Sequence, residues 1–419
     1  MSSTDTCPQR WETIPLRYVC ELNPSVVFDG FDEDDELTFL PMDRIKSGYF
    51  IPNREKFSKY SSSYTAFEDG DIVLAKVTPC FENGNIAIAN DLVGGKGFGS
   101  SELFVIRPTT AERRFLFYYF QSSTFKQEGE ASMTGAGGLK RVSPDVLRQH
   151  NLPFPNRDVQ RLIANYLDRE TARIDGLIAE KERMLALLEE KRAALISRVV
   201  TRGLDPNAPL KPSGQEWLGE IPAHWEVKRC ATVFVEIDER NEPDLPLLNV
   251  SLNTGVTLRV FSDERIESVA ADFTTYKVAR QGDLVFNKMR FWQGAGGIAP
   301  VDGLTSPDYT VARLGEVLCP QYVELLVRLP LFSSEVRRYS YGMVDDRLRL
   351  YWDAFRNLLI PVPPIAEQEQ IARAAITFIR EIHELSATLT CSISLAKERR
   401  AALITAAVTG QIPLEAMQP

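Results

Sequence analysis

A long helical segment that occurs twice constrains this chain more than any other feature. The first copy, residues 158–203, contains no proline and is rich in Leu, Ala, Glu, Lys and Arg, which all favour helix. Its apolar residues recur in alternating steps of three and four, the pattern of a coiled-coil seam. Lys181 and Arg192 interrupt this seam. The expected seam residues are Leu167, Ile174, Ile178, Leu185, Leu188 and Leu195. At ~1.5 Å per residue the helix would be about 60 Å long, which predicts a partner along it.

The second copy lies near the C-terminus and supplies that partner. It aligns with the first without a gap at a constant offset of 208 residues, so that Ile163 corresponds to Ile371 and the peptide RAALI occurs at 192–196 and 400–404. Two unrelated amphipathic helices would not share one offset, and we therefore read the pair as an internal repeat. The expected seam residues of the second helix are Ile379, Ile382, Leu389, Ile393 and Leu403.

The segments that precede the two helices repeat each other in outline only. Gly70-Asp71-Ile72-Val73 corresponds to Gly282-Asp283-Leu284-Val285, and a lysine follows each aspartate five residues later. In the first segment, strand-like runs at 37–42, 71–77, 86–89 and 102–107 accompany an aromatic-rich helix at 112–122 and a helix capped by Ser143. This mixture predicts an α+β fold. The expected boundaries are a first domain at 1–155, a helix at 156–203, a connector at 204–224, a second domain at 225–363 and a second helix at 364–412.

Composition and the absence of known motifs limit the possible functions. The chain has 419 residues, six scattered cysteines without a CxxC pair and a formal net charge of −9. No apolar run is long enough to span a bilayer, and no signal peptide is recognisable, which predicts a cytoplasmic protein with reduced thiols. There is no GxxxxGK[ST] motif, the Gly-rich run at 134–138 lacks the setting of a nucleotide site, and the three histidines suggest no metal cluster. We expect no catalytic site, cofactor or metal in this chain.

Two strand-to-turn segments carry side chains that can read DNA. Amides and guanidiniums can bind base edges bidentately, and lysine can hold a phosphate. The candidates in the first domain are Lys76, Thr78, Phe81, Asn83, Lys140 and Arg141. Those in the second are Asn287, Lys288, Arg290, Trp292, Gln293, Arg347 and Arg349. In the alternative interpretation the aromatic side chains pack in the domain cores and the cations are solvated.

Taken together these features resemble the specificity subunit of type I restriction–modification enzymes, over nearly the whole chain. The connector 213–225 (SGQEWLGEIPAHW) resembles that family's junction. Residues 67–84 with 99–102 resemble one class of its target recognition domains, and 282–290 with 306–309 resemble another. The resemblance adds four candidates for DNA contact, which are Ser100, Ser101, Ser306 and Tyr309.

The resemblance implies a non-catalytic subunit whose two target recognition domains each bind one half of a split, asymmetric site in double-stranded DNA. The two helices would pair as an antiparallel coiled coil and set the spacing of the half-sites. Two modification subunits would use S-adenosylmethionine to methylate adenine at N6, and restriction subunits would use ATP and Mg²⁺ to translocate and cut. Two rival hypotheses remain, namely an assembly scaffold or antirestriction mimic that binds those subunits without reading DNA, and a stand-alone enzyme.

Overall fold

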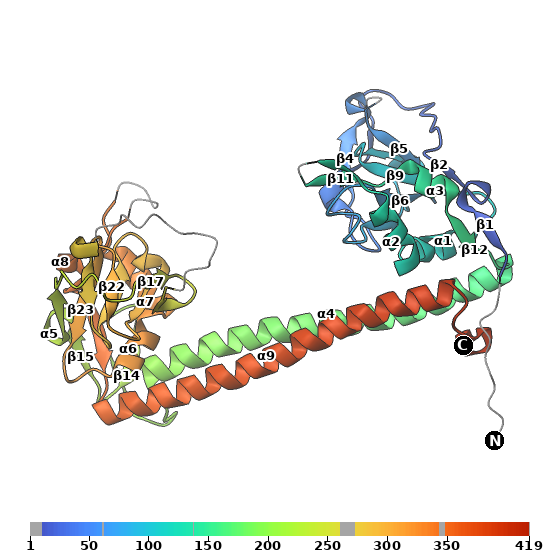
Figure 1. Ribbon diagram of the computed structural model, residues 1–419. Helices are drawn as coiled ribbons and strands as arrows, with labels where there is room; N and C mark the ends of the chain where they lie inside the picture. The colour runs from blue at the N-terminus through green and yellow to red at the C-terminus, as the bar shows by residue number, and fades with distance from the viewer. Residues whose placement is uncertain (1–10, 61–62, 137, 260–272, 343–347, 419) are drawn as a thin grey trace, which may run out of the picture. The chain divides into compact units, whose positions relative to one another are not determined.

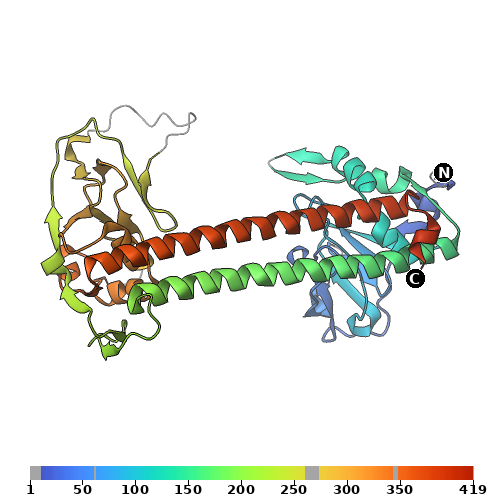
Figure 2. The same cartoon turned by 90° about the horizontal axis from the view of Figure 1, so that it is seen from below.

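The computed structural model describes residues 11–60, 63–136, 138–259, 273–342 and 348–418. The predicted contact residue Arg347 therefore lies outside the described residues. The fold consists of two mixed α+β domains and two long helices, α4 (Arg157–Arg202) and α9 (Ile365–Val408), which confirms the predicted fold class. Figures 1 and 2 show α4 and α9 side by side in both views. None of the helices in the described ranges is both long and apolar enough to cross a bilayer.

The chain divides into two compact units, and each contains one domain with part of both long helices. The first unit is residues 1–183 with 389–419, and the second is residues 184–388. In the first unit, Asp175 of α4 binds Arg400 of α9, and Lys181 of α4 donates a hydrogen bond to Ser392 at 2.9 Å. As the residue number increases along α4, the number of its partner on α9 decreases, so the helices run antiparallel. Lys181, which interrupts the apolar stripe, has a polar partner on the other helix.

The predicted seam residues are all buried or half-buried. Leu167, Ile174, Ile178, Ile382 and Ile393 are no more than 9% exposed. Coiled-coil pairing stabilises such helices mainly by burying this stripe, because isolated helices gain little from propensity alone. Each long helix ends close to a glycine with positive φ, Gly203 (76°) and Gly410 (75°), a conformation that glycine adopts at low cost.

A four-stranded antiparallel sheet forms the core of the first domain, in the order β2-β9-β6-β7. Helices α1 and α2 supply the aromatic side chains that pack on one face of it, including Phe115, Tyr119 and Phe125. A second sheet, β4-β3-β8-β5, covers the other face through Leu40 and Phe67. The elements are β1 (Thr13–Pro15), β2 (Cys20–Leu22), β3 (Glu36–Leu40), β4 (Asn53–Lys56), β5 (Thr65–Glu68), β6 (Ile72–Ala75), β7 (Ile86–Ile88), β8 (Lys96–Gly99), β9 (Leu103–Pro108), α1 (Arg113–Tyr119), α2 (Ser123–Ala131), β10 (Thr134–Ala136), β11 (Leu139–Arg141), α3 (Pro144–Gln149) and β12 (Asn151–Pro153).

The second domain repeats this sheet and its helices, but its covering strands form two separate pairs in place of one four-stranded sheet. Its central sheet has the equivalent order β16-β23-β20-β21, whereas its covering layer consists of the pairs β17-β18 and β19-β22. The elements are β13 (Leu210–Pro212), β14 (Glu220–Pro222), β15 (Glu226–Arg229), α5 (Cys230–Val233), β16 (Phe234–Ile237), β17 (Leu248–Ser251), β18 (Gly255–Leu258), β19 (Lys277–Ala279), β20 (Leu284–Asn287), β21 (Gly296–Ile298), β22 (Gly303–Thr305), β23 (Tyr309–Leu314), α6 (Pro320–Val327), α7 (Pro330–Arg338), α8 (Trp352–Phe355) and β24 (Leu359–Val362).

Two details of the first domain bear on the sequence predictions. Ser143 caps α3, as predicted, and its side chain accepts a hydrogen bond from the amide of Asp145. The helix predicted at 112–122 is confirmed as α1, although it ends at Tyr119, and α2, which was not predicted, starts at Ser123. The hydroxyl of Ser122 accepts from the amide of Phe125 and so serves as the N-cap of α2, which serine favours over a helix interior.

A buried glutamine anchors the start of each long helix to its domain. The side chain of Gln160 accepts from the amide of Glu112 at 2.7 Å and donates to the carbonyl of Pro155. Gln368, which lies 208 residues later, accepts from the amide of Cys319 at 2.8 Å and donates to the carbonyl of Pro363. Both glutamines are at most 1% exposed, so their hydrogen bonds are shielded from water. The constant offset thus extends to the anchoring side chains.

Candidate nucleic-acid interface

In the first domain, the end of β6 and the β10–β11 hairpin bring several predicted residues together. Val77 forms a bridge with Arg141, and the carbonyl of Lys76 accepts from the amide of Val142 at 2.8 Å. The Thr78 hydroxyl donates to the carbonyl of Gly138 and accepts from the amide of Lys140, both at 2.9 Å. Thr78 therefore fixes the hairpin that carries the basic pair Lys140 and Arg141.

One acidic side chain neutralises part of this basic cluster. Arg141 donates two hydrogen bonds to the Glu102 carboxylate, at 2.7 and 2.9 Å, and the Lys76 ammonium lies 4.0 Å from the same carboxylate. The hydrogen bonds from Arg141 hold the pKa of Glu102 below its ordinary value, so Glu102 is ionised at neutral pH. A phosphate that binds here has to compete with Glu102 for Arg141. Lys76 and Arg141 were predicted from the sequence, whereas the role of Glu102 was not.

The structure excludes Phe81 from the candidate set. Its side chain is 1% exposed and packs near Phe125, and a Cβ atom at Gly129 would come within 2.3 Å of its ring. A side chain held in this way belongs to the core and cannot stack on a base, so the prediction that it contacts DNA is wrong. Phe291, at 1% exposure, is likewise a core residue.

The equivalent turn of the second domain mixes structural and exposed residues. The side chain of Asn287, which is 9% exposed, accepts from the amide of Met289 and so shapes the turn. Trp292 donates from its indole nitrogen to the carbonyl of Met289, and the Arg337 guanidinium lies 5.3 Å from its ring centroid. Arg290 and Gln293 are exposed, and their side chains form no hydrogen bond or ion pair with the described residues. These two side chains can reach a ligand without rearrangement of the turn.

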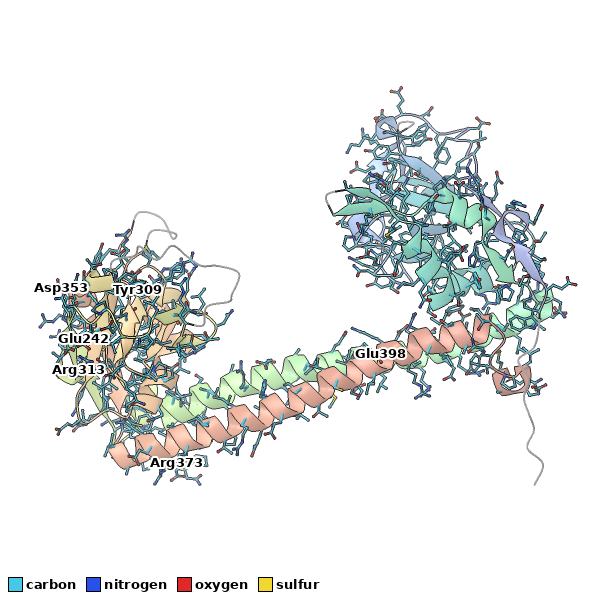
Figure 3. The ribbon with its side chains drawn as sticks, viewed as in Figure 1. Glu242, Tyr309, Arg313, Asp353, Arg373 and Glu398 are labelled. Carbon is cyan, nitrogen blue, oxygen red and sulfur yellow. The ribbon has the colours of Figure 1, made fainter. Side chains whose placement is uncertain are left out.

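The serines of both domains share one local role. Ser100 accepts a hydrogen bond from the amide of Glu102 at 3.2 Å, and Ser306 accepts one from the amide of Asp308 at 3.4 Å. Each serine thus stabilises the turn that precedes the central strand β9 or β23. Ser101 is exposed, whereas Tyr309 is half-buried and pairs with Asn287 across the strands. Figure 3 labels Tyr309 on the second domain.

The second domain carries basic residues at the places that correspond to Lys76 and Arg141. Of these, Lys288 and Arg349 lie within the described residues. Lys288 accepts a backbone hydrogen bond from Leu350 at 2.8 Å, as Lys76 does from Val142. Arg349 is exposed and bridges Tyr341 through its backbone. The turn arrangement of the first domain therefore recurs in the second, where its lysine and arginine occupy equivalent places.

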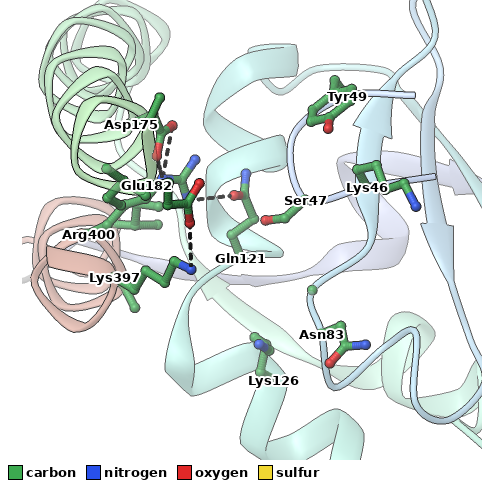
Figure 4. A pocket seen from close by; sticks show the side chains of 15 residues that line it. Lys46, Ser47, Tyr49, Asn83, Gln121, Lys126, Asp175, Glu182, Lys397 and Arg400 are labelled. Atoms are coloured by element: carbon green, nitrogen blue, oxygen red, sulfur yellow. Dashed lines mark hydrogen bonds and ion pairs between the residues drawn. The ribbon is translucent and has the colours of Figure 1, made fainter. Parts of the chain in front are cut away.

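The predicted residue Asn83 lies in a different place from the cluster around Arg141. It lines a cavity of about 810 Å³ in the first unit, between the domain and the α4–α9 pair (Figure 4). On the helix side, Arg400 binds Asp175 at 2.9 Å and Gln121 at 3.3 Å, while Lys397 binds Glu182 at 3.3 Å. The Arg400–Gln121 contact ties α9 to the domain, whereas the other two contacts join α9 to α4. Neither Lys76 nor Lys140 lines this cavity.

A buried ion pair that sequence analysis did not identify explains the repeated Gly-Asp motif. Asp71, at 1% exposure, accepts two hydrogen bonds from Arg107 of β9, at 2.7 and 2.8 Å. Asp283 accepts two from Arg313 of β23, both at 3.1 Å; Arg313 is labelled in Figure 3. The motif therefore holds two central strands together. The recurrence of an arginine at the same place in both domains was the signal that could have revealed it.

No group of three or more His, Cys, Asp and Glu side chains that could hold a metal ion occurs in the part of the chain that the structure describes.

Comparisons with known proteins agree with this architecture. Residues 8–184 match the family model described as the type I restriction modification DNA specificity domain. The EcoAI specificity subunit of Escherichia coli is 36% identical over 165 residues, which are 38% of this chain but only 28% of that relative's length. The MjaVIII specificity subunit of Methanocaldococcus jannaschii is 22% identical over 87% of this chain and 85% of its own length.

Solved structures share the fold along nearly the full chain. The HsdS subunit from Thermoanaerobacter tengcongensis superposes with a TM-score of 0.56 at 19% identity, and covers 97% of this chain and 98% of its own. A chain from a study of complex assembly and conformational transition of the type I R-M system has a TM-score of 0.70 at 18% identity, over 97% of this chain and 99% of that one. In its matching domain, its relatives and its fold, this chain is similar to the specificity subunits of type I restriction–modification enzymes.

Proposed function

We propose that this chain is the non-catalytic DNA-reading subunit of a cytoplasmic type I restriction–modification complex. Each domain binds one half of an asymmetric, bipartite site in double-stranded DNA. Two modification subunits then methylate adenine at N6 with S-adenosylmethionine, and restriction subunits translocate and cut DNA with ATP and Mg²⁺. These cofactors belong to the partner subunits.

One observation carries this proposal, namely that the same strand-and-turn scaffold presents different chemistry in the two domains. Near the turn after β6, Lys76 and Arg141 are paired with Glu102. The turn after β20 instead exposes Arg290 and Gln293. Because base edges differ in their donors and acceptors, two different surfaces on one scaffold suit two different half-sites.

Exposed apolar side chains on the long helices support the proposed binding of protein partners. Six apolar side chains of α4 and α9 are between 48% and 59% exposed, although apolar side chains normally face the protein core. They are Leu177, Met184, Leu187, Ile376, Leu385 and Leu395. Modification subunits that bind the long helices would bury these side chains and so remove them from water.

The direct test is to purify the chain with its modification subunits and to map methylated adenines in DNA exposed to the complex. We expect methylation at one bipartite motif with a fixed spacer, and a gel-shift with duplexes that contain it. Methylation without any bipartite motif would contradict the proposal. A chain that binds the modification subunits but gives no DNA-sequence preference would instead support an assembly scaffold or antirestriction mimic, which the net charge of −9 favours.

Replacing Glu102 with glutamine should strengthen DNA binding by the complex several-fold at low salt. The substitution keeps the shape of the side chain but releases Arg141 and Lys76 for phosphate. Each additional phosphate contact steepens the dependence of log affinity on log salt by about 1. Glu36→Gln is the matched control, because Glu36 is also an acid of the first domain but is exposed, and it pairs with exposed Arg54 at 3.7 Å. Equal effects of both variants, or an altered first half-site, would contradict this role of Glu102.

A further inference from the structure

The second domain contains a buried lysine for which the described part of the domain offers only a distant partner. The Lys277 side chain is 6% exposed, and its ammonium lies 3.8 Å from the Asp238 carboxylate, beyond hydrogen-bonding distance. Asp238 itself accepts two hydrogen bonds from Arg240, at 2.8 and 3.2 Å. A buried ammonium normally has full hydrogen-bonding partners, because removing it from water is costly.

Charged side chains of both signs act on the Lys277 ammonium within the described residues. Asp238 and Glu236 favour its charge, whereas Lys288 and Arg240 oppose it. Burial is the main cause that lowers the pKa of Lys277, and the nearby Lys288 and Arg240 lower it further. An anionic or acceptor-rich ligand would relieve both the repulsion and the missing hydrogen bonds.

A buried hydroxyl opposite Lys277 also has no hydrogen-bond partner among the described residues. Thr305 lies directly opposite Lys277 in the β19–β22 ladder, so their side chains share one face. The hydroxyl oxygen of Thr305 is buried and unpartnered. Most buried polar groups are hydrogen-bonded, whereas here an ammonium and a hydroxyl on the same face both lack a hydrogen-bond partner.

Apart from Lys76, the counterpart of Lys288, the first domain has uncharged residues at the corresponding positions. Thr65 precedes Gly70 by five residues, as Lys277 precedes Gly282, and it pairs with Gly99 where Lys277 pairs with Thr305. Leu22 takes the place of Glu236 in the neighbouring strand. The charged cluster is therefore not required by the scaffold, since the first domain folds without it. It is particular to the second domain.

We propose that Lys277, with Lys288 and Arg240 around it, forms a binding site in the second domain for the oxygen acceptors of the DNA half-site read by that domain. This inference rests on the proposed function and identifies a residue that determines affinity or specificity there. Two sources supply such acceptors, a backbone phosphate and the major-groove edge of guanine, whose O6 and N7 lysine can bind.

The test compares Lys277→Met with wild type in the complex with modification subunits. Methionine keeps the length of the apolar stem and removes the charge, and Asp238 keeps Arg240 as its partner. We expect DNA affinity to fall about 10- to 100-fold, the usual cost of one lost base contact. If the ligand is a base edge, only the cognate second half-site is affected and one of its positions becomes degenerate. If the ligand is a phosphate, all sequences are affected alike and the salt slope falls by about 1.

Two controls separate this inference from its alternatives. Lys228→Met removes a cation of the same domain that pairs with Glu226 in the sheet of β15 and β24, and it should leave DNA binding unchanged. Formaldehyde cross-linking of the unsubstituted complex needs no variant, and peptide mapping should show a cross-link between Lys277 and cognate DNA. Unchanged affinity together with no cross-link would overturn the inference. A wild-type complex without sequence-specific binding would instead refute the proposed function itself.

Discussion

Replacing Arg107 with alanine should destabilise the first unit by about 3 kcal/mol. Asp71 is buried and accepts two hydrogen bonds from Arg107, so the variant leaves a carboxylate in the core without its cation. Breaking a buried pair from one side costs about 3–5 kcal/mol. We expect the lower end of this range because the Arg107 side chain is 28% exposed and water can partly replace it. Urea unfolding of the full chain, followed by circular dichroism, measures the loss.

The location of the effect distinguishes a buried ion pair from a general loss of charge. Hydrogen exchange should accelerate in β6 and β9, the strands that Asp71 and Arg107 join, and remain unchanged in β20 and β23. Arg54→Ala is the control, because the Arg54–Glu36 pair is exposed on both sides, at 68% and 58%, and such pairs contribute about 0–1 kcal/mol. Equal destabilisation by both variants would show that the buried pair has no special role.

The overall architecture could be predicted from the sequence, because the internal repeat and the helical spacing of apolar residues are both visible in the linear sequence. The constant offset located both helices, and the spacing of Leu167, Ile174 and Ile178 identified the buried stripe. Helix α2 escaped prediction because its residues, STFKQEGEA, are mostly polar and include Gly129, a residue that disfavours a helix interior. The N-cap at Ser122 did not reveal it either, because serine binds the backbone in turns as well as at helix starts.

The candidate interface was less predictable, because its character depends on pairings across the sheet. Phe81 is a core residue and Arg141 is bound to Glu102, a carboxylate 39 residues away in the chain. Residue type suggested a basic patch, but only the strand register shows which acid faces it. Lys277 was missed for the same reason, since nothing in the sequence reveals that its side chain is buried. Long-range partners decide whether a cation is available.

Removing one heptad from each long helix should shorten the spacer of the methylated motif and leave both half-sites unchanged. The contacts of Asp175 with Arg400 and Lys181 with Ser392 define the antiparallel register. Continued along the pair, this register places 187–193 opposite 382–388, both within the second unit. Deleting both segments preserves the seam, because a seven-residue step returns each apolar residue to the same face.

The expected size of the change follows from helix and duplex geometry. Seven residues at ~1.5 Å each remove about 10 Å of helix, the length of about three base pairs. Each base pair that is removed also rotates the second half-site about the DNA axis by about a tenth of a turn, which turns it away from its domain. We therefore expect a spacer one to three base pairs shorter. Methylome sequencing of cells that express the variant complex measures the spacer directly. Glu190→Ala, a substitution in the same segment that keeps its length, should leave the motif as it was. An unchanged spacer with altered half-sites would show that the helices do not set the distance between the two reading domains.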